Sequence, residues 1–489
     1  MAQGFLYIKI EPRTVSLNLF KAMIDTLVQE APTRKGTNVQ NMDAASKQEW
    51  SYSAGIQAYV FGLPLTIFER ERKLRLDPVA REKAKKFAPA APINRIGHMK
   101  ALATADDIMP YTPNNDTVYS GALVELAEEP VILTVPEILD RYWSVEVADC
   151  YTENLFYIGT RATGGRGGNH AFVGPHWKGT IPEDIIEHRV PYNSLMFALR
   201  IGALPNDNAD LKKVIGLQEK FALTSLSNWG DPKKLGIANV PKLRNRPNYK
   251  GDLAFYQALA DLLAENPPSK QHEAALVLLS RAGIVVGQPL DPDKLDEPTR
   301  NGLARAALIG PEIMKWKVKY RGTPYPTRWN NLRPGDYGVD YLDRAAGALE
   351  GLFVHDRQEA VYFSTYEDGD ATLLDGENGY VLHFNKDEIP PTRKNGFWSI
   401  TMYGSDFQLV KNAINRFSIG DRTKGLVYNE DGSLDIYVQH NAPDSADSNW
   451  LPSPPSGLFR LNYRIYLPVK EASNPSTLSK YLPPLRKAN

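Results

Sequence analysis

The chain is 489 residues long, several times the ~150 residues of a typical domain, so two or three folded units are expected. Its 57 lysines and arginines balance 57 aspartates and glutamates, so no long-range field would attract nucleic acid. Hydrophobic residues make up 42% and charged residues 23%, which excludes a mostly disordered or fibrous chain. The sequence contains no run of about 18 apolar residues, so neither a membrane span nor a membrane partner is predicted.

The beginning of the chain has a helical pattern. Apolar residues at helical spacing predict an amphipathic helix over 17–28, and a polar loop is expected over 32–41. Asp43 is a candidate N-cap for a second helix, which Pro64 is expected to end or kink. Residues 1–11 lack the basic start, apolar stretch and cleavage site of a signal peptide, so a cytoplasmic location is the default expectation.

Short strands are predicted to follow Asp116. Apolar and polar residues alternate over 143–147, which is the pattern of a half-buried strand, and Glu146 is expected to face away from the apolar row. The single cysteine, Cys150, comes directly after this strand, where a buried and inert thiol is favoured over a nucleophile. Further strands are expected over residues 154–160, 170–173 and 195–201.

The middle third changes to helical spacing. This pattern predicts a helical insert, with helices over residues 207–221, 252–265, 272–281 and 298–320. Prolines and glycines in 321–338 indicate a connection with a boundary near Asn330. One more helix is expected over 339–353.

The C-terminal part shows the clearest alternation of apolar and polar residues, over 398–403, 434–439 and 461–467. Asp-Gly and Asn-Gly dipeptides are expected to supply positive-φ glycines for tight turns, at Gly369, Gly376, Gly379 and Gly432. Together the patterns predict an α+β protein with a C-terminal antiparallel β-sandwich of the jelly-roll type. The predicted domains are a β-rich unit with leading helices over 1–205, a mainly helical insert and linker over 206–330, and a helix plus sandwich over 331–489.

Two polar clusters are candidates for a binding site. The first, over 113–119, contains Asn114, Asn115, Asp116 and Tyr119. It is either an Asx turn capped by its own side chains or a polar wall that faces a cleft.

The second cluster, over 415–422, contains Asn415, Arg416, Asp421 and Arg422. Arg416 and Asp421 could pair with each other, or an arginine held by the aspartate could present its remaining donors to a ligand. Planar polar groups and aromatic rings elsewhere in this part would complete such a site, namely Tyr403, His440, Asn449 and Trp450.

Most familiar catalytic signatures are absent from the sequence, including nucleotide-binding glycine loops and Cys-x-x-Cys pairs, so no cofactor is identified. His170 and His176 are six residues apart and could converge, although an ordinary loop pair is favoured. No metal ligands are assigned. A metal-assisted hydrolase that uses His170, His176 or His440 with an aspartate stays an alternative.

Several motifs resemble a known pair of domains. Residues 113–120, 151–154 and 159–164 resemble the N-terminal domain of unknown function catalogued as 1254. The C-terminal part resembles the companion domain catalogued as 1214, through residues 398–403, 415–422, 439–440 and 448–452. The resemblance implies a β-rich N-terminal unit and a C-terminal sandwich similar to jelly rolls of carbohydrate-active proteins. Relatives often carry export signals, so an exported or periplasmic location is compatible with it, and it implies no settled activity.

The first functional hypothesis is an enzyme acting on a polar, polyhydroxylated or carbohydrate-like substrate in an interdomain cleft. Asp116, Asp421 and His440 are its acid/base candidates. Its ligand-binding candidates are Asn114, Asn115, Tyr119, Tyr151, Asn154, Tyr403, Asn415, Arg416, Arg422, Asn449 and Trp450. The alternative is a non-catalytic ligand-binding or assembly protein whose polar clusters are structural hydrogen-bond networks, and a homo-oligomer is compatible with either hypothesis.

Overall fold

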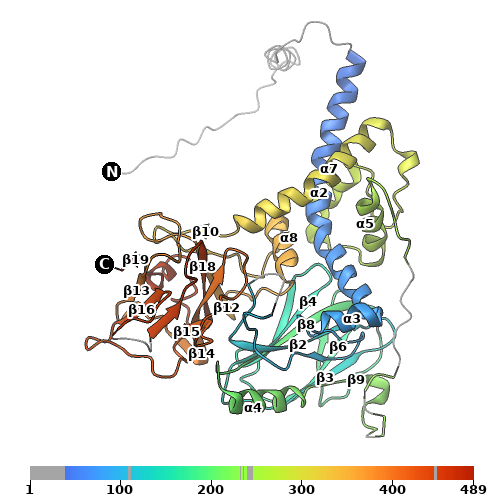
Figure 1. The fold of residues 1–489 in the computed structure, drawn as a ribbon. Helices are drawn as coiled ribbons and strands as arrows, with labels where there is room; N and C mark the ends of the chain where they lie inside the picture. The colour runs from blue at the N-terminus through green and yellow to red at the C-terminus, as the bar shows by residue number, and fades with distance from the viewer. Residues whose placement is uncertain are drawn as a thin grey trace, which may run out of the picture.

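The computed structural model describes residues 39–107, 112–231, 233–234, 236–238, 246–444 and 449–488. It shows an α+β protein in which a layer of helices lies beside two strand-rich units (Figure 1). The helix predicted over 17–28, and Ser448 of the family resemblance, lie outside the described residues.

The longest helix differs from its prediction. Helix α2 (Val39–Leu76) begins before Asp43 and continues past Pro64. The prediction that Asp43 caps the helix is therefore wrong, and Pro64 does not end it. A proline removes one backbone hydrogen bond. Burial on both sides of it, which includes Phe61 and Phe68 at 1% and 4% exposure, outweighs that loss.

The other helices of the layer pack on α2 around two hydrophobic clusters, both of which include residues of α2. Three of them confirm helices predicted in the middle third, namely α5 (Ala254–Glu265), α6 (Glu273–Arg281) and α7 (Glu297–Lys319), and α8 (Tyr341–Glu350) confirms the helix predicted over 339–353. Helix α8 starts where the Asp340 carboxylate accepts a hydrogen bond from the Asp343 N–H at 3.2 Å. Helix α8 packs on α2 and α7, and Figure 1 shows it at the side of the helical layer that faces the strand-rich units.

The N-terminal unit contains two sheets. The five-stranded sheet has the order β1-β2-β8-β4-β5, with β1 (Gly97–His98), β2 (Thr117–Glu125), β8 (Ser194–Gly202), β4 (Trp143–Asp149) and β5 (Asn154–Gly159). The four-stranded sheet has the order β7-β6-β3-β9, with β7 (Ile186–Arg189), β6 (Gly168–Val173), β3 (Val131–Val135) and β9 (Ala222–Ser225). Two short helices accompany them, α3 (Pro78–Ala84) and α4 (Asn208–Gln218).

Strand β4 is buried on both faces, which corrects the expectation of a half-buried strand. Its apolar side packs into the core that the two N-terminal sheets share. Its polar side faces the junction with the C-terminal unit, where Glu146 is 0% exposed. Alternation alone could not reveal this, because it does not say whether the polar face meets water or another domain.

The C-terminal unit is strand-rich, as predicted, and side chains from its two sheets form one core. The six-stranded sheet has the order β10-β11-β12-β18-β14-β15, with β10 (Thr323–Pro324), β11 (Asn330–Asn331), β12 (Ala360–Thr365), β18 (Phe459–Pro468), β14 (Thr392–Gly404) and β15 (Ser418–Gly420). The four-stranded sheet has the order β17-β16-β13-β19, with β17 (Trp450–Pro452), β16 (Leu434–Gln439), β13 (Tyr380–Phe384) and β19 (Leu485–Lys487). The jelly-roll connectivity stays a prediction.

Turn chemistry in the C-terminal unit differs from the prediction. Among the four turn glycines, only Gly432 has a positive φ, of 83°. The Asp375 carboxylate accepts the backbone N–H of Glu377 at 3.0 Å, and Asp368 likewise accepts the N–H of Asp370 at 3.0 Å. These aspartate side chains turn the chain without a left-handed glycine. Across the described residues, no helix combines the length and apolar character needed to cross a bilayer.

Candidate functional site

The two polar clusters meet at the junction between the N-terminal and C-terminal units. Arg422 Nη2 donates to the Asp116 carbonyl oxygen at 3.3 Å and lies 3.5 Å from its carboxylate. The Ser399 hydroxyl donates to Asp116 Oδ2 at 2.6 Å, and Ser418 donates to Asn115 Oδ1 at 3.4 Å. Asn115 and Asp116 are only 5% and 1% exposed, so protein groups from both units enclose them.

Asn114 and two tyrosines extend this contact. The Asn114 amide donates to the hydroxyls of Tyr119 at 3.0 Å and Tyr466 at 2.7 Å, while its oxygen accepts the Asp116 N–H at 2.7 Å. A third tyrosine, Tyr403, also bonds this loop, and its hydroxyl donates to the Pro113 carbonyl at 2.7 Å. These bonds tie the loop before β2 to strands β14 and β18 of the other unit.

Asp421 lies beside Arg422 in this contact. Its carboxylate accepts the backbone N–H of Trp398 at 3.1 Å. Burial raises the pKa of Asp421 to about 6, against the opposing effects of that hydrogen bond and of the Arg422 charge. The Arg422 guanidinium carbon lies 3.4 Å from the centre of the Phe397 ring. Asp116 and Asp421, two of the acid/base candidates, are thus both neighbours of one arginine.

A buried ionic core lies next to this contact. Strand β8 runs between β2 and β4, which places Arg200 opposite Tyr119 and Ser144. Arg200 pairs with the Glu146 carboxylate, and His355 Nδ1 lies 3.1 Å from the same carboxylate. Burial favours the neutral acid, yet the charges of His355 and Arg200 lower the pKa of Glu146 to about 2. We call Glu146, Arg200 and His355 the ionic core.

The remaining C-terminal candidates form a separate group beside β16 and β17. Asn449 fixes the local backbone, since its amide donates to the Val427 and Asp435 carbonyls at 2.6 and 3.0 Å. Further contacts in this group are Trp450 Nε1 to the Gln439 carbonyl at 2.7 Å, Arg416 Nη1 to the Trp450 carbonyl at 2.9 Å, Asn206 to the Asn415 carbonyl at 3.2 Å, and His440 Nδ1 to the Ser453 carbonyl at 3.2 Å. His440 therefore contacts a different segment from Asp116 and Asp421.

Tyr151 and Asn154 belong to a third place, the turn between β4 and β5. The Asp149 carboxylate accepts the backbone N–H groups of Tyr151 at 2.8 Å and Glu153 at 3.0 Å. Inside this turn Thr152 has a φ of 64°, which is strained for a β-branched residue. The Thr152 hydroxyl is buried and has no hydrogen-bond partner among the described residues.

Arg344 of α8 reaches this turn from the helical layer. It is 1% exposed, and its guanidinium carbon lies 5.0 Å from the Tyr341 ring centre, 5.4 Å from that of Phe61 and 5.7 Å from that of Tyr151. Within the part of the chain that the structure describes, none of its three side-chain nitrogens has a hydrogen-bond partner. Buried guanidinium groups normally bond their donors, so this arrangement is unusual.

Two carboxyl groups next to Arg344 have raised pKa values. Burial raises the pKa of Asp149 to about 6 and that of Glu153 to about 7, although the Arg344 charge opposes both shifts. Glu153 Oε1 accepts the Gly338 N–H at 3.0 Å, whereas its buried Oε2 has no partner in the described residues. We call Arg344, Asp149, Thr152 and Glu153 the Arg344 centre. Strain, raised pKa values and unpaired buried polar atoms together mark it as the candidate functional site.

Sequence reasoning missed Arg344 because a charged residue on a predicted helix usually faces solvent. The residues that follow it, Ala345, Ala346, Gly347 and Ala348, are all buried. Such a run of small residues lets α8 approach its neighbours closely and could have signalled that Arg344 lies inside. The resemblance over 151–154 pointed to the turn, but not to the arginine that meets it.

Comparisons with known proteins agree with the arrangement in two units. A model described as "Protein of unknown function (DUF1254)" matches residues 93–225, and one described as "Protein of unknown function (DUF1214)" matches residues 359–470. The chain joins a DUF1254 domain to a DUF1214 domain. A search of curated proteins finds no significant match.

Two solved structures are similar to this chain. The VPA0106 protein from Vibrio parahaemolyticus has a TM-score of 0.66 and 22% identity, over 90% of this chain and 100% of that one. A protein from Burkholderia cenocepacia has a TM-score of 0.40 and 13% identity, over 86% of this chain and 96% of that one. The first likeness supports the fold alone.

The matched ranges place the candidate residues. The turn over 149–154 belongs to the DUF1254 domain, and Arg344 lies in the segment between the two matches. The Asn154 amide donates to the Val354 carbonyl and to Asp356 Oδ1, both at 2.8 Å. The Arg344 centre thus lies where the DUF1254 domain contacts the connection to the DUF1214 domain.

His170 pairs with a different histidine from the one considered in the sequence. Its Nδ1 lies 3.0 Å from His188 Nε2 across the parallel β6–β7 pair, whereas His176 is exposed. The His188 ring stacks on Phe156 with centroids 4.1 Å apart. Among the described residues, no three His, Cys, Asp or Glu side chains group closely enough to hold a metal ion. Cys150 is 0% exposed, and burial raises the pKa of its thiol, in agreement with the prediction of a buried thiol.

The His170–His188 pair should make stability depend on pH. Burial, with the His170 charge, lowers the pKa of His188 from 6.5 to about 4, so the unfolded chain binds more protons between these values. We expect the unfolding temperature to fall as the pH decreases from 6.5 to 4, and His188→Gln to weaken this dependence. His176→Gln is the matched control and should leave it unchanged. Equal pH dependence in all three proteins would contradict this role.

Proposed function

We propose that the protein binds a small polar molecule with several hydroxyl groups at the Arg344 centre. The proposal rests on one observation, the buried and unpaired guanidinium of Arg344, whose charge acts on Glu153, a carboxyl group with an unpaired Oε2. Each buried polar group left without a partner costs about 1–3 kcal/mol. A bound group that completes these bonds would recover that free energy.

The chemistry of the unpaired atoms selects the ligand class. Arg344 offers only donors and the Glu153 carboxylate only acceptors, so the completing group must accept from one and donate to the other. A hydroxyl group of a ligand does both. The Thr152 hydroxyl, which lies in the same turn, can likewise donate to the ligand or accept from it. An additional anion fits less well above pH 7, where ionised Asp149 and Glu153 supply negative charge close to Arg344. The ligand class agrees with the polyhydroxylated molecule expected from the sequence, at a different site.

The junction between the domains supports the structural hypothesis for the two polar clusters. Asn115 and Asp116 are buried and bonded to Ser418, Ser399 and Arg422 of the DUF1214 domain. Buried hydrogen-bond networks of this kind hold domains in one arrangement, although Arg422 Nε has no partner among the described residues. In this proposal the clusters assemble the two domains, and the ligand binds at the Arg344 centre.

Acid–base catalysis on the same ligand is the second candidate function. Its specific support is Glu153, whose pKa of about 7 lets the carboxyl group both give and take a proton near neutral pH. Glu153 would then act on a hydroxyl of the bound molecule, in place of Asp116, Asp421 or His440. Turnover of a bound polyol that is lost in Glu153→Gln would support this function.

Binding can be tested with the full chain by thermal shift and calorimetry against sugars, inositols and linear polyols. We expect saturable binding of at least one compound at millimolar concentration or below, and at least tenfold weaker binding by Glu153→Gln. The exposed Glu273→Gln on α6 is the matched control and should bind as the wild type does.

A control for nonspecific stabilisation is needed, because polyols at high concentration raise the unfolding temperature of most proteins. The deoxy analogues should therefore bind more weakly than the parent compounds. Absence of saturable binding by any polyol, or unchanged binding by Glu153→Gln, would overturn the proposal and leave ordered water as the partner of Arg344.

A further inference from the structure

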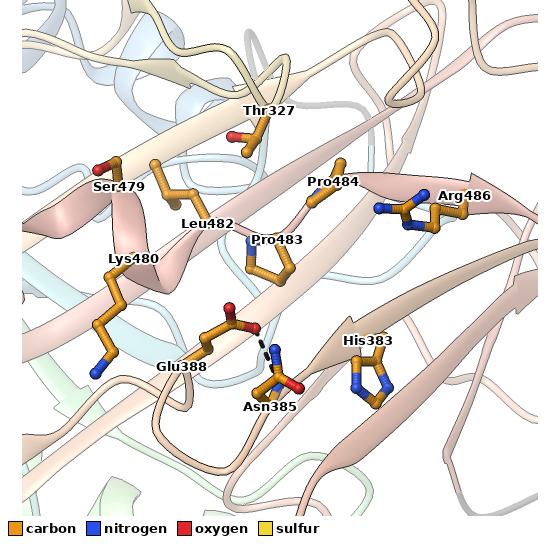
Figure 2. Close-up of a pocket in the computed structure, with 10 residues that line it drawn as sticks. All are labelled: Thr327, His383, Asn385, Glu388, Ser479, Lys480, Leu482, Pro483, Pro484 and Arg486. Atoms are coloured by element: carbon orange, nitrogen blue, oxygen red, sulfur yellow. Dashed lines mark hydrogen bonds between the residues drawn. The ribbon is translucent and has the colours of Figure 1, made fainter.

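The C-terminal unit carries a pocket of about 230 Å³ at one edge of its four-stranded sheet. The pocket lies between β13, the segment that leads into β19, and the loop at Thr327. Figure 2 shows Lys480 and Arg486 at opposite ends of the view, with Pro483 between them. Leu482, Pro483 and Pro484 supply its apolar lining.

Two of the cations at this pocket already have carboxylate partners. His383 Nδ1 lies 2.6 Å from Asp435 Oδ1, and this hydrogen bond raises the pKa of His383. Lys480 Nζ lies 2.7 Å from Asp387 Oδ2. His383 projects from the face of β13 opposite the buried Leu382, as its place in the sequence predicts. Neither pair leaves a full charge for a ligand to neutralise.

Three other groups at the pocket lack such partners among the described residues. Arg486 has no carboxylate within ion-pair distance. Glu388 has no cation within that distance, but its charge contributes to the raised pKa values of His383 and Lys480, and its Oε2 accepts the Asn385 N–H at 2.9 Å. The Thr327 hydroxyl is buried and makes no hydrogen bond to these residues. Besides the paired His383 and Lys480, the pocket therefore presents Arg486, Glu388 and the hydroxyls of Thr327 and Ser479 around an apolar lining.

We propose that this pocket binds a small zwitterion of the α-amino acid class. Its carboxylate would bind the Arg486 guanidinium, whose planar fork matches two carboxylate oxygens. Its ammonium group would bind Glu388, and Thr327 would hydrogen-bond the ligand between them. A simple anion would meet the Glu388 charge, and a simple cation would meet the Arg486 charge, whereas a ligand with both charges matches both groups.

The volume agrees with this ligand class. About 10–15 Å³ of such volume is enough to hold one water molecule, so 230 Å³ holds many waters and has room for a molecule of amino acid size. The site is separate from the Arg344 centre and does not depend on the function proposed there, because the pocket lies entirely in the C-terminal unit.

Calorimetry of the full chain with a panel of free amino acids tests the proposal. We expect saturable binding of at least one amino acid, and loss of binding when its amine is acetylated or its carboxylate is converted to an amide. Arg486→Gln and Glu388→Gln should each weaken binding at least tenfold. Lys487→Gln and Glu430→Gln, at exposed positions outside the pocket lining, are the matched controls and should bind as the wild type does.

Three results would overturn the proposal. They are absence of binding by every free amino acid, equal binding of the acetylated or amidated compounds, and unchanged affinity in Arg486→Gln and Glu388→Gln. Binding of inorganic phosphate without binding of amino acids would instead identify a simple anion site. Glu153→Gln should leave amino acid binding unchanged, so failure here is distinguishable from failure at the Arg344 centre.

Discussion

Arg344→Met is expected to abolish polyol binding while leaving the ligand-free protein as stable as the wild type, or more stable. Arg344 is buried among the rings of Phe61, Tyr151 and Tyr341, and its donors have no partners in the described residues. Replacing a buried charge by an apolar side chain of similar length is often neutral or stabilising by about 1–4 kcal/mol. The buried charge of Arg344 is explained if Arg344 is retained for ligand binding although it lowers the stability of the protein.

Urea unfolding and calorimetry of the same samples measure the two effects. Arg281→Met, at an exposed position on α6, should change the free energy of unfolding by less than about 0.5 kcal/mol and should not change binding. A loss of more than about 2 kcal/mol in Arg344→Met would show that the guanidinium has a structural partner, on the scale of lost bonds to charged groups. That result would contradict the proposed ligand site.

Glu146→Ala should destabilise the protein by about 3–5 kcal/mol, the cost of removing one partner from a buried ion pair. Glu146 is 0% exposed and is the carboxylate that both Arg200 and His355 contact. Without it, the Arg200 charge stays buried at the junction of the two domains. Its folded pKa of about 2 lies below the ordinary 4.5, so its contribution is present above pH 4.5 and is lost as the pH falls towards 2.

A double-mutant cycle separates this interaction from general damage to the core. Adding Arg200→Met to Glu146→Ala should recover part of the lost stability, because it removes the unpaired charge. The exposed Lys100–Glu219 pair, 3.0 Å apart, is the control, and Glu219→Ala should cost no more than about 1 kcal/mol. Equal losses in Glu146→Ala and Glu219→Ala would mean that the buried Glu146–Arg200 pair contributes no more to stability than an exposed pair.

The strand and helix patterns could be predicted because they depend on neighbouring residues. Alternation over 434–439 places Leu434, Ile436 and Val438 in the core at 0% exposure, and β16 follows from it. The turns were harder to predict. Asp368 and Asp375 turn the chain with their own carboxylates, so the glycines beside them need no positive φ.

The candidate site could be predicted only in part. The sequence singled out Tyr151 and Asn154 through a family resemblance, and they flank the strained Thr152 and the unpaired Glu153. It also brought forward the loops around Asp116 and Arg422, which meet in the structure through 3.3 and 3.5 Å contacts. It did not indicate Arg344, which is almost 200 residues away from that turn along the chain.

The sequence by itself determined the α+β class, the two domains of the family pairing, the strands of the C-terminal unit and the helices of the middle third. Only the tertiary structure decided that Glu146 faces another domain instead of water, and that Arg344 is buried without a partner. The physical reason is that secondary structure follows from periodicity among near neighbours. The environment of a charged side chain depends on which distant segments pack against it, and that placement sets its pKa, its bonding and its available chemistry.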